Sequence, residues 1–163
     1  MSIVSFAKRF IIPPEVRAHC DIPCGIYDPI QAKIAAQTVL KMVMRIQALA
    51  LKQPAANAGA EERAAYGNTL TRYITVKERH AELFKREVDI LWHDYFKPEH
   101  LQKHPNLHEV VWKATKLASA NKQSVDLAAA KQLVETADTV ATIFWQTKGV
   151  TYSDPVAAVR LGT

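Results

Sequence analysis

Both cysteines of the chain and one of its histidines lie within six residues near the N-terminus, at His19, Cys20 and Cys24. Thiolate and imidazole groups bind transition metals, and two neighbouring thiols can also form a redox pair. The segment 19–27 is therefore the part of the chain whose residue types could do chemistry. It predicts either a metal site or a local redox pair of Cys20 and Cys24.

An 18-residue segment precedes His19. A secretory signal needs an uninterrupted apolar centre of about 7–15 residues, but Lys8-Arg9 divides the apolar residues here. We interpret residues 1–18 as a pro-segment that is removed by cleavage between Ala18 and His19. In a chain without an export signal, two closely spaced cysteines favour metal or redox chemistry over a structural disulfide.

Cleavage before His19 would place an amine beside two thiolates. The α-amine of His19, with the backbone nitrogen and thiolate of Cys20, can then close two fused chelate rings around a metal ion. Cys24 can add the fourth corner of a square plane because Gly25 permits a sharp backbone turn, and the His19 imidazole can approach axially. Tetragonal sites favour Cu(II) or Ni(II) over zinc. Two thiolates tend to reduce Cu(II), so this donor set favours nickel and one-electron redox chemistry.

The rest of the chain is expected to form the scaffold that carries this hook (residues 19–27). Its 163 residues, 48% hydrophobic and 23% charged, are typical of one globular domain. Amphipathic periodicity predicts four helices, over residues 28–53, over 61–96, from 105, and from 124 or 126 to 148. Their short connections favour an all-α fold, an up-and-down antiparallel four-helix bundle over about 28–149.

Local signals set the expected helix ends. Asp28 is expected to cap the first helix with Pro29 at its first position, and Gly149 is expected to stop the fourth. Gly67 could interrupt the second helix early, and the tail from Thr151 is expected to be loose.

Large apolar side chains at helical spacing are expected to pack in the core: Met42, Met44, Trp112 and Trp145. The five histidines outside the hook do not form a ligand motif. A net charge of +5 suits an acidic partner, a nucleic acid or a small anionic substrate, and charge alone does not choose between them. Because there is no block of like charge and no apolar run near the roughly 20 residues that span a bilayer, we expect neither a nucleic-acid nor a membrane partner.

The pattern His-Cys-Asp-x-Pro-Cys-Gly-x-Tyr-Asp-Pro at 19–29 resembles the mature N-terminus of nickel-containing superoxide dismutases. The likeness covers essentially the whole chain after residue 18. It continues at Lys77-Glu78, Ala81-Glu82-Leu83, Leu91-Trp92, Asp94-Tyr95-Phe96-Lys97-Pro98, Ile143-Phe144-Trp145 and Thr147-Lys148.

The resemblance implies a superoxide dismutase that converts superoxide to dioxygen and hydrogen peroxide by cycling Ni(III) and Ni(II). One nickel ion per subunit would be held by the His19 amine, the Cys20 amide, and the thiolates of Cys20 and Cys24, with the His19 imidazole binding axially. The resemblance also implies a homohexamer of domains 19–163, a cytoplasmic location, and a dedicated peptidase that cuts before His19.

Four further residues are implied to shape the route of the substrate: Asp21, Pro23, Tyr27 and Tyr95. Tyr27 is also implied to act in catalysis, together with the three metal-binding residues.

The sequence departs from some members of this family at two positions. Their axial imidazole is oriented by a glutamate on the first helix and an arginine on the second, and these positions are Ala35 and His80 here. A metal-bound imidazole usually needs such a partner. We expect His80 or Gln37 to replace it.

Two other functions use the same residues. A nickel carrier would have the same donors without turnover. A non-catalytic helical bundle could carry Cys20 and Cys24 only as a local redox pair.

Overall fold

The computed structural model describes residues 25–162, so the pro-segment and the first six residues of the hook lie outside the described residues. Within this range every regular element is a helix, which confirms the all-α prediction. The elements are α2 (Ile30–Ala50), α3 (Ala60–Ile90), the π-helix η1 (Leu91–Tyr95), α4 (Pro98–Lys103), α5 (Leu107–Gln123), α6 (Leu127–Thr147) and α7 (Ala157–Leu161). None of the helices in 25–162 is long and apolar enough to cross a membrane.

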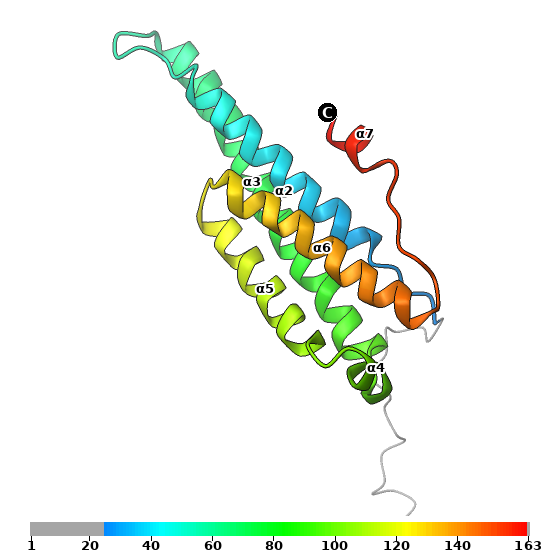
Figure 1. Cartoon of the computed structure of the whole chain (residues 1–163). Coiled ribbons are helices and arrows are strands. Elements are labelled where there is room, and N and C mark those ends of the chain that lie inside the picture. Colours follow the sequence, from blue (N-terminus) through cyan, green and yellow to red (C-terminus); the bar gives the residue numbers. More distant parts are fainter. Residues whose placement is uncertain (1–24, 163) are drawn as a thin grey trace, which may run out of the picture.

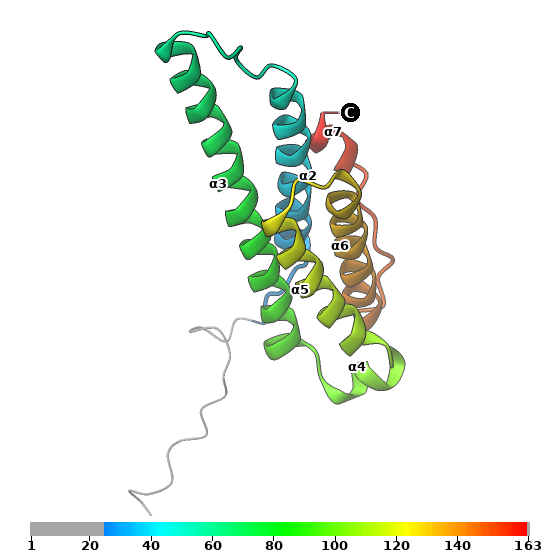
Figure 2. The same cartoon turned by 90° about the vertical axis from the view of Figure 1, so that its left-hand side faces the viewer.

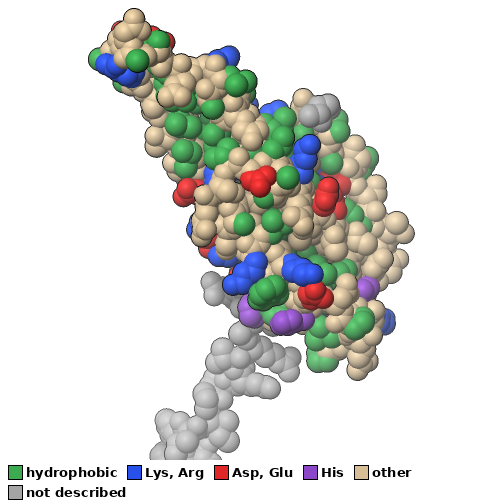
Figure 3. All heavy atoms as spheres, turned by 60° about the vertical axis from the view of Figure 1, so that its left-hand side comes forward, with side chains coloured by type: hydrophobic (Ala, Val, Ile, Leu, Met, Phe, Trp, Pro, Cys, Tyr) green, Lys and Arg blue, Asp and Glu red, His purple; other side chains and the backbone are tan. Residues whose placement is uncertain are grey.

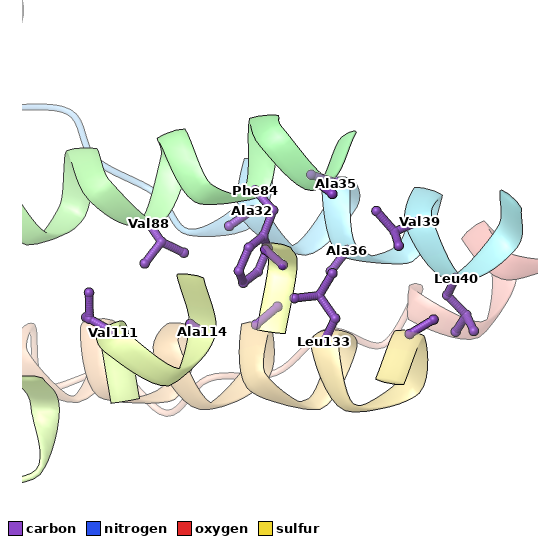
Figure 4. Close-up of a cluster of buried hydrophobic side chains, with 14 of the residues drawn as sticks. Ala32, Ala35, Ala36, Val39, Leu40, Phe84, Val88, Val111, Ala114 and Leu133 are labelled. Carbon is purple, nitrogen blue, oxygen red and sulfur yellow. The ribbon is translucent and has the colours of Figure 1, made fainter. Parts of the chain in front are cut away.

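The four long helices form an antiparallel bundle (Figures 1 and 2). α2 packs on α3 and α6, and α5 packs on the same two helices. This arrangement confirms the predicted four-helix bundle. Small and branched side chains fill the centre, with Phe84 as the one aromatic ring of the main apolar cluster that is fully buried (Figure 4).

Aspartates open two of the helices. Asp28 accepts the backbone N–H of Ile30 at 2.8 Å, and Asp126 accepts those of Ala128 and Ala129. Each carboxylate satisfies amides that the first helical turn leaves without a partner. The predicted stop at the end of α6 is also confirmed, because Gly149 has a φ of 72°, in the left-handed region.

The second predicted helix differs from the structure at its end. It runs without a break past Gly67, but the α-helix stops at Ile90 and a single π turn follows over 91–95. Phe96 and Lys97 are then extended, and Pro98 begins the short helix α4, which the sequence did not predict. A proline disfavours α geometry in the residue before it but suits the first position of a new helix.

Helices α2 and α3 project beyond the turn between α5 and α6 as a two-helix arm (Figures 1 and 2). Lys77 of α3 lies against the end of α5, so the turns of α3 before it have only α2 as a partner. No residue in the stretch 47–76 is buried. Apolar side chains are exposed along this arm, among them Leu51 at 90% (Figure 3).

The C-terminal tail packs against the bundle, so the expectation that it is loose was wrong. The Gln37 side-chain amide donates to the carbonyl of Ala157 at 3.0 Å and accepts from Arg160 at 2.8 Å. Lys41 donates to the carbonyl of Leu161 at 2.6 Å. These three bonds attach α7 to the side of α2, and Figure 2 shows the two helices next to each other.

A partly buried ion pair anchors the same segment at its other end. The Lys33 ammonium, 2% exposed as a residue, lies 2.5 Å from Asp138, and the Tyr152 hydroxyl donates to Asp138 at 3.0 Å. Burial, helped by the hydrogen bond to Asp138, raises the pKa of the Tyr152 phenol. These bonds were not predicted because each joins residues more than ten positions apart.

The core prediction was wrong for two large side chains. Met42 is buried at 8% exposure and Trp145 is half-buried, but Met44 is 38% exposed and Trp112 is 54% exposed. The ammonium group of Lys116 instead lies over the Trp112 ring, 5.8 Å from the ring centre. Both errors have one cause, because these two side chains lie at the edge of an apolar stripe and helical spacing alone does not locate that edge.

Candidate metal centre

The predicted ligands His19, Cys20 and Cys24 lie outside the described residues, as do Ala18, Asp21 and Pro23. The described part of the hook begins at Gly25, whose φ of 69° lies in the left-handed region that favours glycine. This agrees with the prediction that the chain turns sharply after the second cysteine. The hook therefore joins the bundle through Gly25, Ile26 and Tyr27.

Tyr27 and Tyr95 are brought together, although 68 positions separate them in the sequence. Their ring centres are 5.5 Å apart with an interplanar angle of 52°. Tyr27 precedes α2, and Tyr95 is the last residue of η1. Of the four residues expected to shape the substrate route, these are the two that the structure describes, and they are in contact.

Tyr95 owes its position to the π turn. The backbone N–H of Phe96 bonds to the carbonyl of Leu91, five positions earlier, at 2.9 Å. The wider turn rotates the side chains that follow it relative to those of α3, and such turns are frequent at functional sites. Tyr95 and Phe96 thereby both pack at the same end of the bundle.

Aromatic rings surround Tyr95 on several sides. The centre of the Phe144 ring is 4.5 Å from that of Tyr95, and the His100 ring stacks on Tyr95 at 5.4 Å with an angle of 18°. The members of this aromatic cluster are Tyr27, Tyr95, Phe96, His100, Phe144 and Trp145. They come from α4, α6, η1 and the segments that flank η1 and α2, so the cluster exists only in the folded chain.

His100 is a neutral member of the cluster at pH 7. Burial lowers the pKa of His100 from its ordinary value of 6.5, while the nearby Glu99 acts in the opposite direction. Its Nδ1 accepts the backbone N–H of Lys97 at 3.2 Å, which requires that this nitrogen carry no proton. The imidazole can therefore stack on Tyr95 without adding a charge.

Lys148, the residue directly after α6, places its ammonium group beside the aromatic cluster. The Lys148 ammonium lies 5.1 Å from the centre of the Tyr95 ring and 5.3 Å from that of Phe144. A cation over an aromatic face is attracted by the ring. Figure 3 shows histidine, basic and acidic side chains gathered at one end of the bundle.

The two positions that differ from some family members lie on α2 and α3. Ala35 is fully buried in the apolar cluster beside Phe84 (Figure 4), so α2 offers no acceptor there. The Gln37 side chain is occupied by α7 through both its nitrogen and its oxygen. His80 donates from Nδ1 to the carbonyl of Val76 at 2.8 Å, which leaves its Nε2 as the acceptor in the neutral ring.

No second metal site competes with the hook in the described range. Among residues 25–162 no three His, Cys, Asp or Glu side chains are placed to hold a metal ion. Two of the histidines outside the hook pack against aromatic rings: His100 stacks on Tyr95, and His108 meets the edge of Trp92 at 5.6 Å.

Comparison with known proteins identifies the hook and its scaffold. The sequence model of the family described as nickel-containing superoxide dismutase matches residues 14–148, a range that includes the whole hook. The chain belongs to the nickel-containing superoxide dismutase family. The segment 149–163, which contains α7, lies outside the matched range.

Two curated family members come from Streptomyces. The superoxide dismutase [Ni] of Streptomyces seoulensis is 38% identical over 145 residues, which cover 87% of this chain and 97% of that protein. The one of Streptomyces coelicolor is 39% identical over 142 residues, again 87% and 97%.

Solved structures of nickel superoxide dismutases share the fold. The native enzyme matches with a TM-score of 0.64 and 38% identity, over 80% of this chain and 99% of that one. A crystal structure with nickel ligation corresponding to the oxidised state matches with a TM-score of 0.66 and 37% identity, over 81% and 100%.

Some residues of this site were missed by sequence reasoning. Thr147 and Lys148 were recognised as part of the family pattern, but no role was predicted for them, and His100 was considered only as one of the five histidines outside the hook. The sequence carries only a weak signal for these three residues, because no pattern of residue types along the chain places the end of α6 beside Tyr95. The contact depends on the bundle.

Proposed function

We propose that this protein is a superoxide dismutase whose nickel ion is held by the new N-terminus that cleavage before His19 creates. The observation that carries the proposal is the family match across the hook, whose last residue Tyr27 packs on Tyr95. The His19 amine, the Cys20 amide, and the thiolates of Cys20 and Cys24 would hold the ion. The donor set fits nickel because two thiolates and two nitrogens suit a tetragonal site.

Bound nickel would supply one-electron redox chemistry, by which one superoxide ion is oxidised to dioxygen and another takes up one electron and two protons from solvent to give hydrogen peroxide. The residues of the chain would bind the nickel ion and orient the substrate. Asp21 and Pro23 of the hook, with Tyr27 and Tyr95 at the bundle, would shape the route of the substrate. Tyr27 fixes the end of the hook, because its ring lies in the aromatic cluster.

The remaining parts of the proposal concern assembly and maturation. A dedicated peptidase would remove residues 1–18, and the mature domains 19–163 would form a homohexamer in the cytoplasm. The similarity to nickel superoxide dismutases over most of the chain supports these steps.

Nickel content and turnover together test the function. The mature chain, isolated with its metal, should have the mass of a chain that starts at His19, contain one nickel per chain, and accelerate the decay of superoxide. A protein that carries nickel but leaves superoxide decay unchanged would be a carrier, and the proposed activity would be wrong. A control in which nickel is removed by a chelator should lose the activity and regain it when nickel is returned.

His80 is proposed to orient the imidazole of His19 through its Nε2, which would accept a hydrogen bond from that ring. Replacing it by alanine should lower activity by about 10–100-fold, the usual effect of removing a hydrogen-bond partner of a metal ligand. The electron paramagnetic resonance signal of oxidised nickel should change as well. His80→Gln, whose side-chain carbonyl can still accept, is the control. An unchanged signal and unchanged activity in His80→Ala would count against this role.

A further inference from the structure

The side chain of Thr147, the last residue of α6, makes a hydrogen bond to Tyr95 that the proposed function does not use. The two hydroxyl oxygens are 2.5 Å apart, and either could be the donor in this contact alone. The Thr147 oxygen is also 2.6 Å from the backbone carbonyl of Phe144. Tyr95 and Phe144 belong to the aromatic cluster. Thr147 lies at the end of α6, the helix that contains Phe144.

The second contact decides the direction of the first. A carbonyl oxygen can only accept, so the single hydroxyl proton of Thr147 must point to Phe144. The proton between Thr147 and Tyr95 then has to come from Tyr95. The hydrogen bonds therefore run in one direction, from the Tyr95 phenol to the Thr147 hydroxyl and on to the Phe144 carbonyl.

The direction of these hydrogen bonds determines whether the Tyr95 hydroxyl can donate or only accept a hydrogen bond on the side of the hook. Its only proton is committed to Thr147, so its oxygen presents a lone pair and accepts hydrogen bonds. Superoxide is an anion and also accepts, so it cannot bind directly to an oxygen that has no proton to give. A water molecule can connect the two, since one of its hydrogens bonds to the phenol and the other faces the anion.

Packing contacts hold the ring of Tyr95 in place, in addition to the hydrogen bond of its hydroxyl group. His100 stacks on the ring, Phe144 and Tyr27 pack against it, and the Lys148 ammonium lies 5.1 Å from its centre. Rotation that would turn the phenolic proton toward the hook would break the bond to Thr147. A hydrogen bond inside such a packed cluster is stronger than one in water.

We propose that Thr147 is a positioning residue that fixes the Tyr95 phenol as a hydrogen-bond acceptor, which orders a water molecule on the approach of superoxide to the hook. The role of this water rests on the proposed function, whereas the direction of the hydrogen bonds does not. Tyr95 itself is then not the group that donates a hydrogen bond to the substrate.

Three variants of the mature chain, which begins at His19, test the proposal. Thr147→Val has nearly the same shape but no hydroxyl, and Thr147→Ser keeps the hydroxyl. Thr142→Val is the matched control, because Thr142 is a half-buried threonine of α6 that bonds to the carbonyl of Asp138 at 2.7 Å but does not contact Tyr95. Each variant is examined by NMR with ¹³C-labelled tyrosine, and its nickel-loaded form is assayed for superoxide decay.

The NMR result does not depend on activity. The Tyr95 hydroxyl proton should exchange slowly with solvent in the wild type, in Thr147→Ser and in Thr142→Val, and its signal should be lost in Thr147→Val. Fast exchange in the wild type, or a protected proton in Thr147→Val, would overturn the hydrogen-bond direction.

The activity result tests the role at the hook. The superoxide decay rate should fall by about 3–10-fold in Thr147→Val, as expected for the loss of one neutral hydrogen bond, and should return in Thr147→Ser. Equal rates in Thr147→Val and the wild type would overturn the positioning role. A wild type that keeps its protected proton but does not dismute superoxide would overturn the proposed function and, with it, the role of the ordered water.

Discussion

A mature chain that retains only Ala18 before His19 is expected to bind nickel at least about 100-fold more weakly and to show no dismutase activity. Loss of a group that merely supports a metal ligand costs about 10–100-fold, and here a ligand itself would change. The retained peptide bond turns the His19 amine into an amide, which is a poor donor. Every side chain of the hook remains the same. The result would therefore isolate the contribution of the chain end.

The comparison needs two chains, one beginning at His19 and one at Ala18. Nickel binding is measured by competition with a chelator, and activity by superoxide decay. The unfolding midpoint of the metal-free chains is the control, and it should agree between the two because residues 18 and 19 precede the packed bundle, which begins at Tyr27. Full activity with Ala18 or the whole pro-segment retained would contradict the proposed site.

Replacing Lys77 by methionine is expected to lower the free energy of unfolding by about 2–4 kcal/mol. Lys77 is 2% exposed, and its ammonium donates to the carbonyls of Asn121, Lys122 and Ser124 at 2.6, 2.8 and 2.9 Å. These carbonyls lie at the end of α5, where a helix has no partners of its own for them. Methionine fills the space but leaves the carbonyls without a donor.

A second lysine of the same region provides the matched control. Lys122 forms an exposed ion pair with Glu82 at 2.9 Å. Exposed pairs contribute little, so Lys122→Met should leave the unfolding midpoint in urea nearly unchanged. Both variants are measured at one protein concentration, because subunit association would also shift the midpoint. Equal midpoints for Lys77→Met and the wild type would show that the three bonds do not support the fold.

The bundle could be predicted from the sequence because its signals are local. Asp28, Asp126 and Gly149 mark helix ends by their own chemistry, and each acts within a few residues of its position. Apolar spacing predicted the four long helices in the same way. The π turn at 91–95 and the helix after Pro98 were missed, because the pattern of apolar residues continues through both.

The C-terminal segment shows where local patterns fail. Residues 149–162 have no strong apolar periodicity, and they pack because Gln37, Lys41 and Asp138 on other helices supply partners for their polar groups. Those partners are more than ten positions away in each case. The segment also lies outside the range that matches the family, so the family pattern carried no information about it.

The sequence by itself determined the chemistry of the proposed metal site. His19, Cys20 and Cys24 lie within six residues of the chain, so their identity and spacing are enough to favour nickel once the chain begins at His19. The surroundings of the hook depended on the tertiary structure. Tyr27, Tyr95 and Thr147 come from three separate segments, and only packing of the helices brings their rings and hydroxyl groups within reach of one another.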